Sequence, residues 1–168
     1  WDYLGWRDTL ARPEFTERQR AYAAMRGAPE VYTPQAVVNG RAAVVGSDRE
    51  AVEARIGEDA ARGPALPVDV SVERAADVLR IDVAAAPGHA PRRGAKLWLA
   101  VFDHHVEVPV KGGENSGRRL EYRNVVRSLR PVGMWRGEPL SLEIPLEDEA
   151  GRLGRGEAVL LQAYGRKG

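Results

Sequence analysis

The segment VYTPQAVVNGRAAVVGSD, residues 31–48, predicts a β-hairpin that leads into a helix. Its two short apolar runs, residues 36–38 and 42–45, are separated by Asn39 and Gly40. An Asn-Gly pair is typical of a type I′ turn, because both central residues of that turn need positive φ. We therefore expect two short antiparallel strands joined at this pair.

Helices are predicted on both sides of this hairpin. Residues 12–26 carry apolar side chains at loosely helical spacing and are followed by a glycine that suits a C-cap. After the hairpin, Ser47 and Glu50 form a capping-box pattern, in which the serine hydroxyl accepts from the glutamate amide. A helix should begin there, with Val52 and Ile56 facing inward.

The second part of the chain has the alternating pattern of β-strands. Seven strands are predicted, at residues 68–72, 79–83, 96–102, 106–110, 120–126, 140–146 and 158–164. Short strands joined by glycine- and proline-containing turns favour an antiparallel β-sandwich. We therefore predict an α+β chain with two domains, a helix–hairpin–helix domain at residues 1–63 and a β-sandwich at residues 64–168.

Composition excludes several classes of function. The 168 residues carry a formal net charge of +1 and no long run of like charge, so no nucleic-acid partner is expected. No apolar run is long enough to span a membrane, and no signal peptide is visible at Trp1. The absence of cysteine excludes disulfides and thiol chemistry within these residues. We expect no cofactor.

Residues 111–127 form the densest polar cluster in the sequence. Guanidinium groups bind carboxylates and phosphates in a fork, so this cluster is a candidate anion-binding face. The alternative is a long hairpin whose arginines pair with neighbouring glutamates. The candidate binding residues here are Glu114, Asn115, Arg118, Arg119, Arg123 and Arg127.

Two further groups are weaker candidates for a site. The aromatic residues Trp1, Tyr3 and Trp6 could line a ligand groove or pack in a core. His104 and His105 are adjacent between two predicted strands, so in extended structure they point to opposite faces. We therefore expect solvated histidines and no metal ligands.

A family resemblance rests on motifs spread along the chain. They are WDYLGW at residues 1–6, FTERQRAY at 15–22, VYTPQ at 31–35, VVGSD at 44–48, VPV at 108–110, GEN at 113–115, GR at 117–118 and YRNVVR at 122–127. Together they resemble a bacterial secreted thioredoxin-like family, domain of unknown function 1223.

The resemblance implies a partial thioredoxin-like domain followed by a small β-rich domain, in proteins that are periplasmic or secreted. It also implies a cis peptide bond between Thr33 and Pro34. These two are the residues of the family site that this chain retains, and they are a candidate peptide-binding position. Family members typically have a Cys-x-x-Cys motif upstream of the segment that matches residues 1–3. This chain contains no cysteine.

Three functional hypotheses follow. We expect a non-catalytic, truncated thioredoxin-like protein that acts as a binding or structural module. One alternative is a thiol-disulfide oxidoreductase whose dithiol lies in a missing N-terminal segment, and another is a carbohydrate- or peptide-binding module centred on the sandwich. The expected partner is a protein, a peptide, or a second chain that completes the N-terminal domain.

Overall fold

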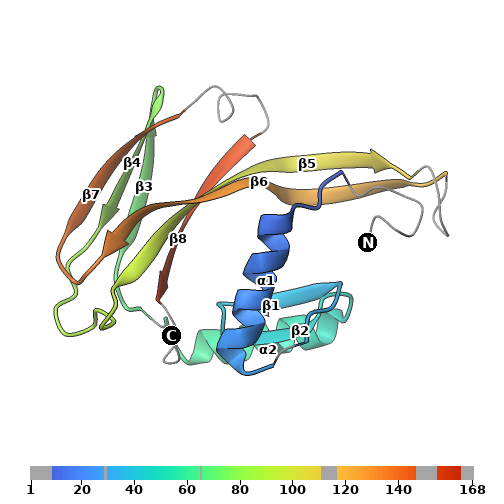
Figure 1. Cartoon of the computed structure of the whole chain (residues 1–168), viewed down its shortest axis with the longest axis horizontal. Coiled ribbons are helices and arrows are strands. Elements are labelled where there is room, and N and C mark those ends of the chain that lie inside the picture. Colours follow the sequence, from blue (N-terminus) through green and yellow to red (C-terminus); the bar gives the residue numbers. More distant parts are fainter. Residues whose placement is uncertain (1–8, 29, 65, 111–116, 147–154, 164–168) are drawn as a thin grey trace. The chain divides into compact units, whose positions relative to one another are not determined.

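The computed structural model describes residues 9–28, 30–64, 66–110, 117–146 and 155–163. These residues form two α-helices and three small antiparallel sheets (Figure 1). Contacts within the chain define two compact units, Ala11–Pro67 and the larger Val68–Tyr164. We call them the helix–hairpin unit and the β-rich unit. The domain boundary predicted near residue 63 stays a prediction.

The helix–hairpin unit has the element order that the sequence predicts. Its elements are α1 (Pro13–Arg26), β1 (Gln35–Val38), β2 (Ala42–Val45) and α2 (Arg49–Ala61). Among the described residues, β1 and β2 pair only with each other, in an antiparallel two-stranded sheet. The Thr33–Pro34 peptide bond that precedes β1 is cis, as predicted.

The hairpin turn forms at the predicted residues. Asn39 and Gly40 have φ values of 45° and 71°, which is the left-handed backbone that a type I′ turn requires. The Arg41 amide donates to the Val38 carbonyl at 2.9 Å and closes the turn. The pair of strand residues nearest the turn is Val38 and Ala42. Arg41 therefore lies between the turn and β2.

Two details of α2 differ from the prediction. The N-cap is Asp48 and not Ser47: its carboxylate Oδ1 accepts from the Ala51 amide at 3.0 Å. A carboxylate at this position is also favoured by the positive end of the helix dipole. Ile56 was expected to face inward, but 52% of its surface is exposed, whereas Val52 is half-buried.

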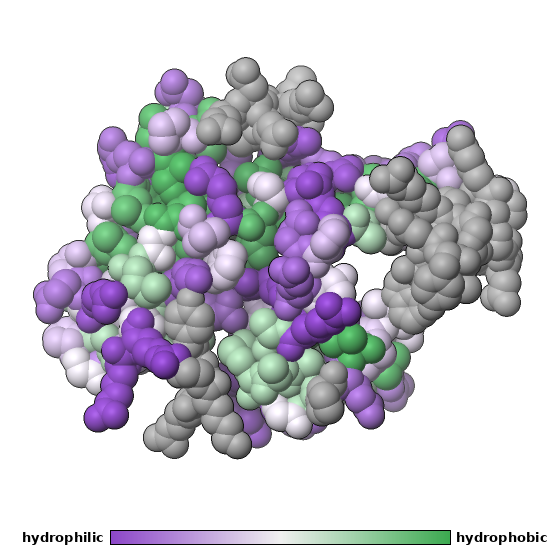
Figure 2. All heavy atoms as spheres, viewed as in Figure 1, coloured by the Kyte–Doolittle hydropathy of each residue, from purple (hydrophilic) through white to green (hydrophobic). Residues whose placement is uncertain are grey.

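The helix–hairpin unit has almost no apolar core among its described residues. Ala23 is the one buried apolar side chain there, and Asp59 is the one buried polar residue. Hydrophobic side chains instead reach the surface, where Figure 2 colours them green among hydrophilic neighbours. The large apolar residues exposed in this unit are Met25, Val31, Tyr32, Val45 and Ile56.

The β-rich unit contains two three-stranded antiparallel sheets. Its strands are β3 (Val70–Ala75), β4 (Val78–Val83), β5 (Ala95–Pro109), β6 (Arg119–Trp135), β7 (Leu140–Pro145) and β8 (Arg155–Ala163). One sheet has the order β3–β4–β7 and the other the order β6–β5–β8. β5 and β6 are much longer than the other strands and run side by side (Figure 1).

The described residues of this unit form six strands, one fewer than predicted. The predicted strands at residues 96–102 and 106–110 are one continuous strand, β5, which contains both His104 and His105. No glycine or proline lies between the two predicted segments to end the first of them. The register with β6 shifts at Val101/Phe102, and pairing continues beyond this irregularity as far as Pro109.

Two contacts join the two sheets of the β-rich unit, and its largest fully buried side chains come from β4, β5 and β6. The Trp135 indole Nε1, from β6, donates at 3.2 Å to the carbonyl of Ala84, the residue that follows β4. Arg74 of β3 reaches Glu157 of β8, with 2.9 Å between Nη1 and Oε1. The largest fully buried side chains are Trp135, Leu79, Ile81, Leu97, Leu99 and Val83.

Neither described helix is both long enough and apolar enough to cross a membrane.

Candidate functional site

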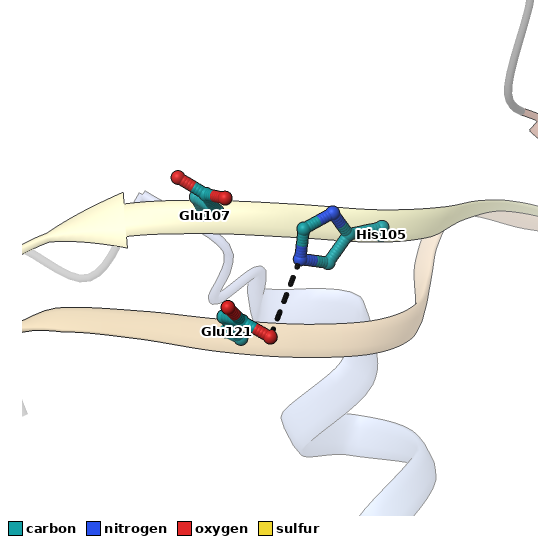
Figure 3. Close-up of side chains that lie close together, drawn as sticks. All are labelled: His105, Glu107 and Glu121. Carbon is teal, nitrogen blue, oxygen red and sulfur yellow. Dashed lines mark ion pairs between the residues drawn. The ribbon is translucent and has the colours of Figure 1, made fainter.

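The far half of the β5–β6 pair is a two-stranded ribbon. β8 pairs with β5 only over residues 95–103, whereas β6 continues to pair with β5 as far as Pro109. Beyond residue 103, β5 therefore has one described neighbour. Polar side chains gather on one face of this ribbon. We call His105, Glu107 and Glu121 the ribbon cluster (Figure 3).

Strand register brings the ribbon cluster together. His105 and Glu107 are two residues apart on β5, so both point to the same face. On β6, Glu121 is the direct partner of Glu107 and lies diagonal to His105. His105 Nε2 is 3.7 Å from Glu121 Oε2, and one possible ligand atom from each residue lies within 4.8 Å of the other two. All three side chains are exposed.

Two arginines border the ribbon cluster. Arg119 Nη1 lies 3.5 Å from Glu107 Oε2, and Arg123 Nη2 lies 3.9 Å from Glu121 Oε2. The arginine side chains are 78% and 70% exposed. Long, exposed ion pairs of this kind contribute little to stability, so the arginines only loosely neutralise the two carboxylates.

A second charged group lies closer to the core of the same sheet. Asp103 of β5 accepts from Arg127 Nε of β6 at 2.6 Å and from Arg155 Nε of β8 at 2.9 Å. Burial opposes ionisation of this carboxyl, but the hydrogen bonds and charges of the two arginines outweigh burial and lower the pKa of Asp103. This Asp103 cluster connects all three strands of the sheet.

A third group fastens the hairpin of the other unit to its second helix. Asp59 of α2 accepts from Asn39 Nδ2 at 2.6 Å and from Arg41 Nη1 at 3.0 Å. Arg41 also donates to the Gly63 carbonyl. The hydrogen bond from Asn39 is the main cause of a lowered pKa for Asp59; burial opposes it and Arg41 adds to it. The turn residues thus have a structural role.

The structure brings together only part of the predicted binding face. Arg119 and Arg123 lie on the ribbon with Glu121 between them, as expected, and Arg118 is exposed beside the turn. Arg127 instead contacts Asp103. Thr33 and Pro34 are exposed just before β1. Glu114, Asn115, Trp1, Tyr3 and Trp6 lie outside the described residues. Binding at all these positions stays a prediction.

The ribbon cluster was not predicted from the sequence, where His105 pairs most obviously with its neighbour His104. His104 points to the other face and packs its ring edge-on against Phe102. The useful signal is the spacing of His105 and Glu107, two residues apart in one strand, combined with Glu121 in the next strand. That combination needs the register of the β5–β6 pair, which the sequence does not state.

Comparisons with known proteins place this chain in a family. The family described as protein of unknown function (DUF1223) matches residues 1–162, and the chain belongs to it. The chain is also similar to the X-ray crystal structure of a protein from Agrobacterium tumefaciens, with 37% sequence identity and a TM-score of 0.73. The similarity covers 87% of this chain but 60% of that one. No curated protein matches the chain.

Proposed function

We propose that the helix–hairpin unit is part of a thioredoxin-like domain and that the protein acts by binding an extended polypeptide segment. One observation carries the proposal: among the described residues of this unit, Ala23 is the sole buried apolar side chain, while five large apolar side chains are exposed. Folded units are stabilised mainly by burying apolar surface. The helix–hairpin unit therefore needs a partner that covers its exposed apolar side chains.

The hairpin offers the place for such a segment. A sheet of two strands is marginally stable, and both its outer edges carry backbone groups that can pair with another strand. The residues of β1 are all half-buried, and Val45 of β2 is 48% exposed. An added strand would bond to the free backbone groups and cover these side chains. We propose that the occupant is a polypeptide, because a polypeptide backbone supplies the row of N–H and C=O groups that a strand edge pairs with.

Two further features fit the proposal. The order helix, hairpin, helix is that of the second half of a thioredoxin-like domain. The similar protein from Agrobacterium tumefaciens is longer, since the match spans 60% of it. We further propose that the two sheets of the β-rich unit form a β-sandwich. We also propose that the protein is exported from the cytoplasm, and this proposal rests on the family resemblance alone.

We propose binding and not catalysis because these 168 residues contain no nucleophile for thiol chemistry. The chain has no cysteine, and thiol-disulfide exchange needs an attacking thiolate. The oxidoreductase and carbohydrate-binding hypotheses stay predictions.

A peptide titration tests the proposal. The probe is a peptide of about eight alternating valine and threonine residues with a lysine at each end, long enough to form one strand. We expect it to slow hydrogen exchange at the β1–β2 hairpin and to leave exchange in β4 unchanged. The same peptide with N-methylated central residues cannot complete the backbone hydrogen bonds and should bind much more weakly.

Surface variants provide the matched control. Val45→Lys together with Ile56→Lys places charge on the exposed apolar surface of the helix–hairpin unit and should weaken peptide binding. Val72→Lys changes a similarly exposed valine, 43% exposed, in the β-rich unit and should leave binding unchanged. Equal binding by the N-methylated peptide, or protection confined to the β-rich unit, would overturn the proposal.

A further inference from the structure

We propose that the ribbon cluster, His105, Glu107 and Glu121, binds a divalent metal ion of the zinc class. The proposal concerns the β-rich unit and does not depend on peptide binding by the helix–hairpin unit. It rests on three converging side chains of the right chemistry, held on adjacent strands (Figure 3).

The spacing of the three side chains is close to that of a coordination shell. Zinc binds imidazole nitrogen and carboxylate oxygen at about 2.1 Å, so ligand atoms of a tetrahedral site lie about 3.4 Å apart. His105 Nε2 and Glu121 Oε2 are already 3.7 Å apart. The possible ligand atoms of all three residues lie within 4.8 Å of one another. Exposed side chains can close this difference by rotation, with no movement of the backbone.

The backbone beneath the cluster is set by strand pairing. Glu107 and Glu121 are direct partners across β5 and β6, and His105 is the next residue on the same face. Two like charges placed directly opposite each other destabilise a strand pair. A cation held between these carboxylates removes that repulsion, so metal binding and ribbon pairing stabilise each other.

The bordering arginines compete only weakly for the carboxylates. Their contacts are 3.5 Å and 3.9 Å long, which is beyond the range of strong charge-assisted hydrogen bonds. Arg119 and Arg123 are also the more exposed partners in these pairs. Both guanidinium groups can swing into solvent when a metal ion binds, and their removal should strengthen metal binding.

The donor set selects the class of metal. One imidazole nitrogen and two carboxylate oxygens, without sulfur, suit zinc and its transition-metal neighbours better than calcium or magnesium, which prefer oxygen alone. Three protein ligands leave the fourth tetrahedral position for water. The exposure of all three side chains indicates a surface site that exchanges metal readily.

Calorimetric titration of the full chain with zinc chloride at neutral pH tests the site. We expect wild type to bind one zinc ion. The variants His105→Ala, Glu107→Gln and Glu121→Gln should bind zinc at least about tenfold more weakly than wild type. The figure is a lower bound, because even loss of a residue that only supports a metal ligand weakens binding about 10- to 100-fold. The double variant Arg119→Ala/Arg123→Ala should bind zinc more tightly than wild type.

The other two histidines of the chain give matched controls. His104 is the neighbouring residue on the opposite face of β5, and His89 lies outside the strands. His104→Ala and His89→Ala should keep wild-type zinc affinity. Absence of binding by wild type at millimolar zinc, or unchanged affinity in His105→Ala, would overturn the proposal. So would loss of binding in either control.

Discussion

Replacement of Asp103 by alanine should strongly destabilise the β-rich unit. The change removes the acceptor of two charge-assisted hydrogen bonds, from Arg127 at 2.6 Å and from Arg155 at 2.9 Å. It also removes the carboxylate that both guanidinium groups contact. The three side chains are only 20%, 28% and 15% exposed, so solvent replaces these interactions poorly.

The size of the effect follows from these contacts. A hydrogen bond to a charged group contributes about 1.5–3 kcal/mol, and the remaining exposure of these side chains favours the lower end. Two such bonds give a loss of about 3 kcal/mol in the free energy of unfolding. With a urea dependence of about 1.5 kcal/mol per molar, the unfolding midpoint should fall by about 2 M.

Urea unfolding followed by tryptophan fluorescence measures this shift, because Trp135 is fully buried in the same unit. The control is Glu143→Ala, which breaks a cross-strand pair with Arg80 whose side chains are 61% and 47% exposed. That pair should contribute nothing measurable, as exposed ion pairs commonly do. If Asp103→Ala shifts the midpoint no more than Glu143→Ala does, the Asp103 cluster does not hold the sheet together.

The same cluster predicts a dependence on pH. The folded state lowers the pKa of Asp103 below its ordinary value of 3.8. The stabilisation is therefore fully present above the ordinary pKa and is lost as the pH falls through the folded pKa. The stability difference between wild type and Asp103→Ala should be constant near neutral pH and shrink in acid. A constant difference down to strongly acidic pH would show that ionisation of Asp103 is not its source.

Three other substitutions have defined outcomes. Asp59→Ala removes the acceptor for both hydrogen bonds from the hairpin turn, so amides of β1 should exchange faster, whereas Glu58→Ala, exposed on the same helix, should not change them. Gly156→Ala places a methyl group 2.7 Å from the Phe102 ring and should cost about 1–3 kcal/mol in thermal unfolding. Gly57→Ala meets nothing within 4 Å in α2 and should gain about 0.5–1 kcal/mol; loss of stability would contradict an open helix face.

The sequence predicted those elements whose signals are local. The Asn39-Gly40 pair determined the hairpin turn, because few other residues adopt positive φ without strain. The glycine after α1 likewise forms the left-handed C-cap of that helix, with φ of 71° at Gly27. In each case a few adjacent residues contain the whole physical reason for the structure.

Predictions failed where neighbours in space decide the outcome. Ile56 has helical spacing for an inward face, yet 52% of its surface is exposed. The two predicted strands at residues 96–110 merged into β5, because pairing with β6 continues through the histidines. The side-chain clusters depend on contacts between residues far apart in the sequence. Asp103, for example, contacts arginines that are 24 and 52 residues away. Register between strands fixes such contacts, and sequence periodicity alone does not specify register.

Native-state hydrogen exchange of the full chain, with its monomeric state established by sedimentation, tests the central claim most directly. The claim is that residues 11–67 bury too little apolar surface to be stable without an added polypeptide. Amides of β1 and β2 should therefore exchange at least about tenfold faster than those of β4 and the paired centre of β5, because local opening is easiest where burial is least. Equal and high protection of both units in a proven monomer would contradict the claim.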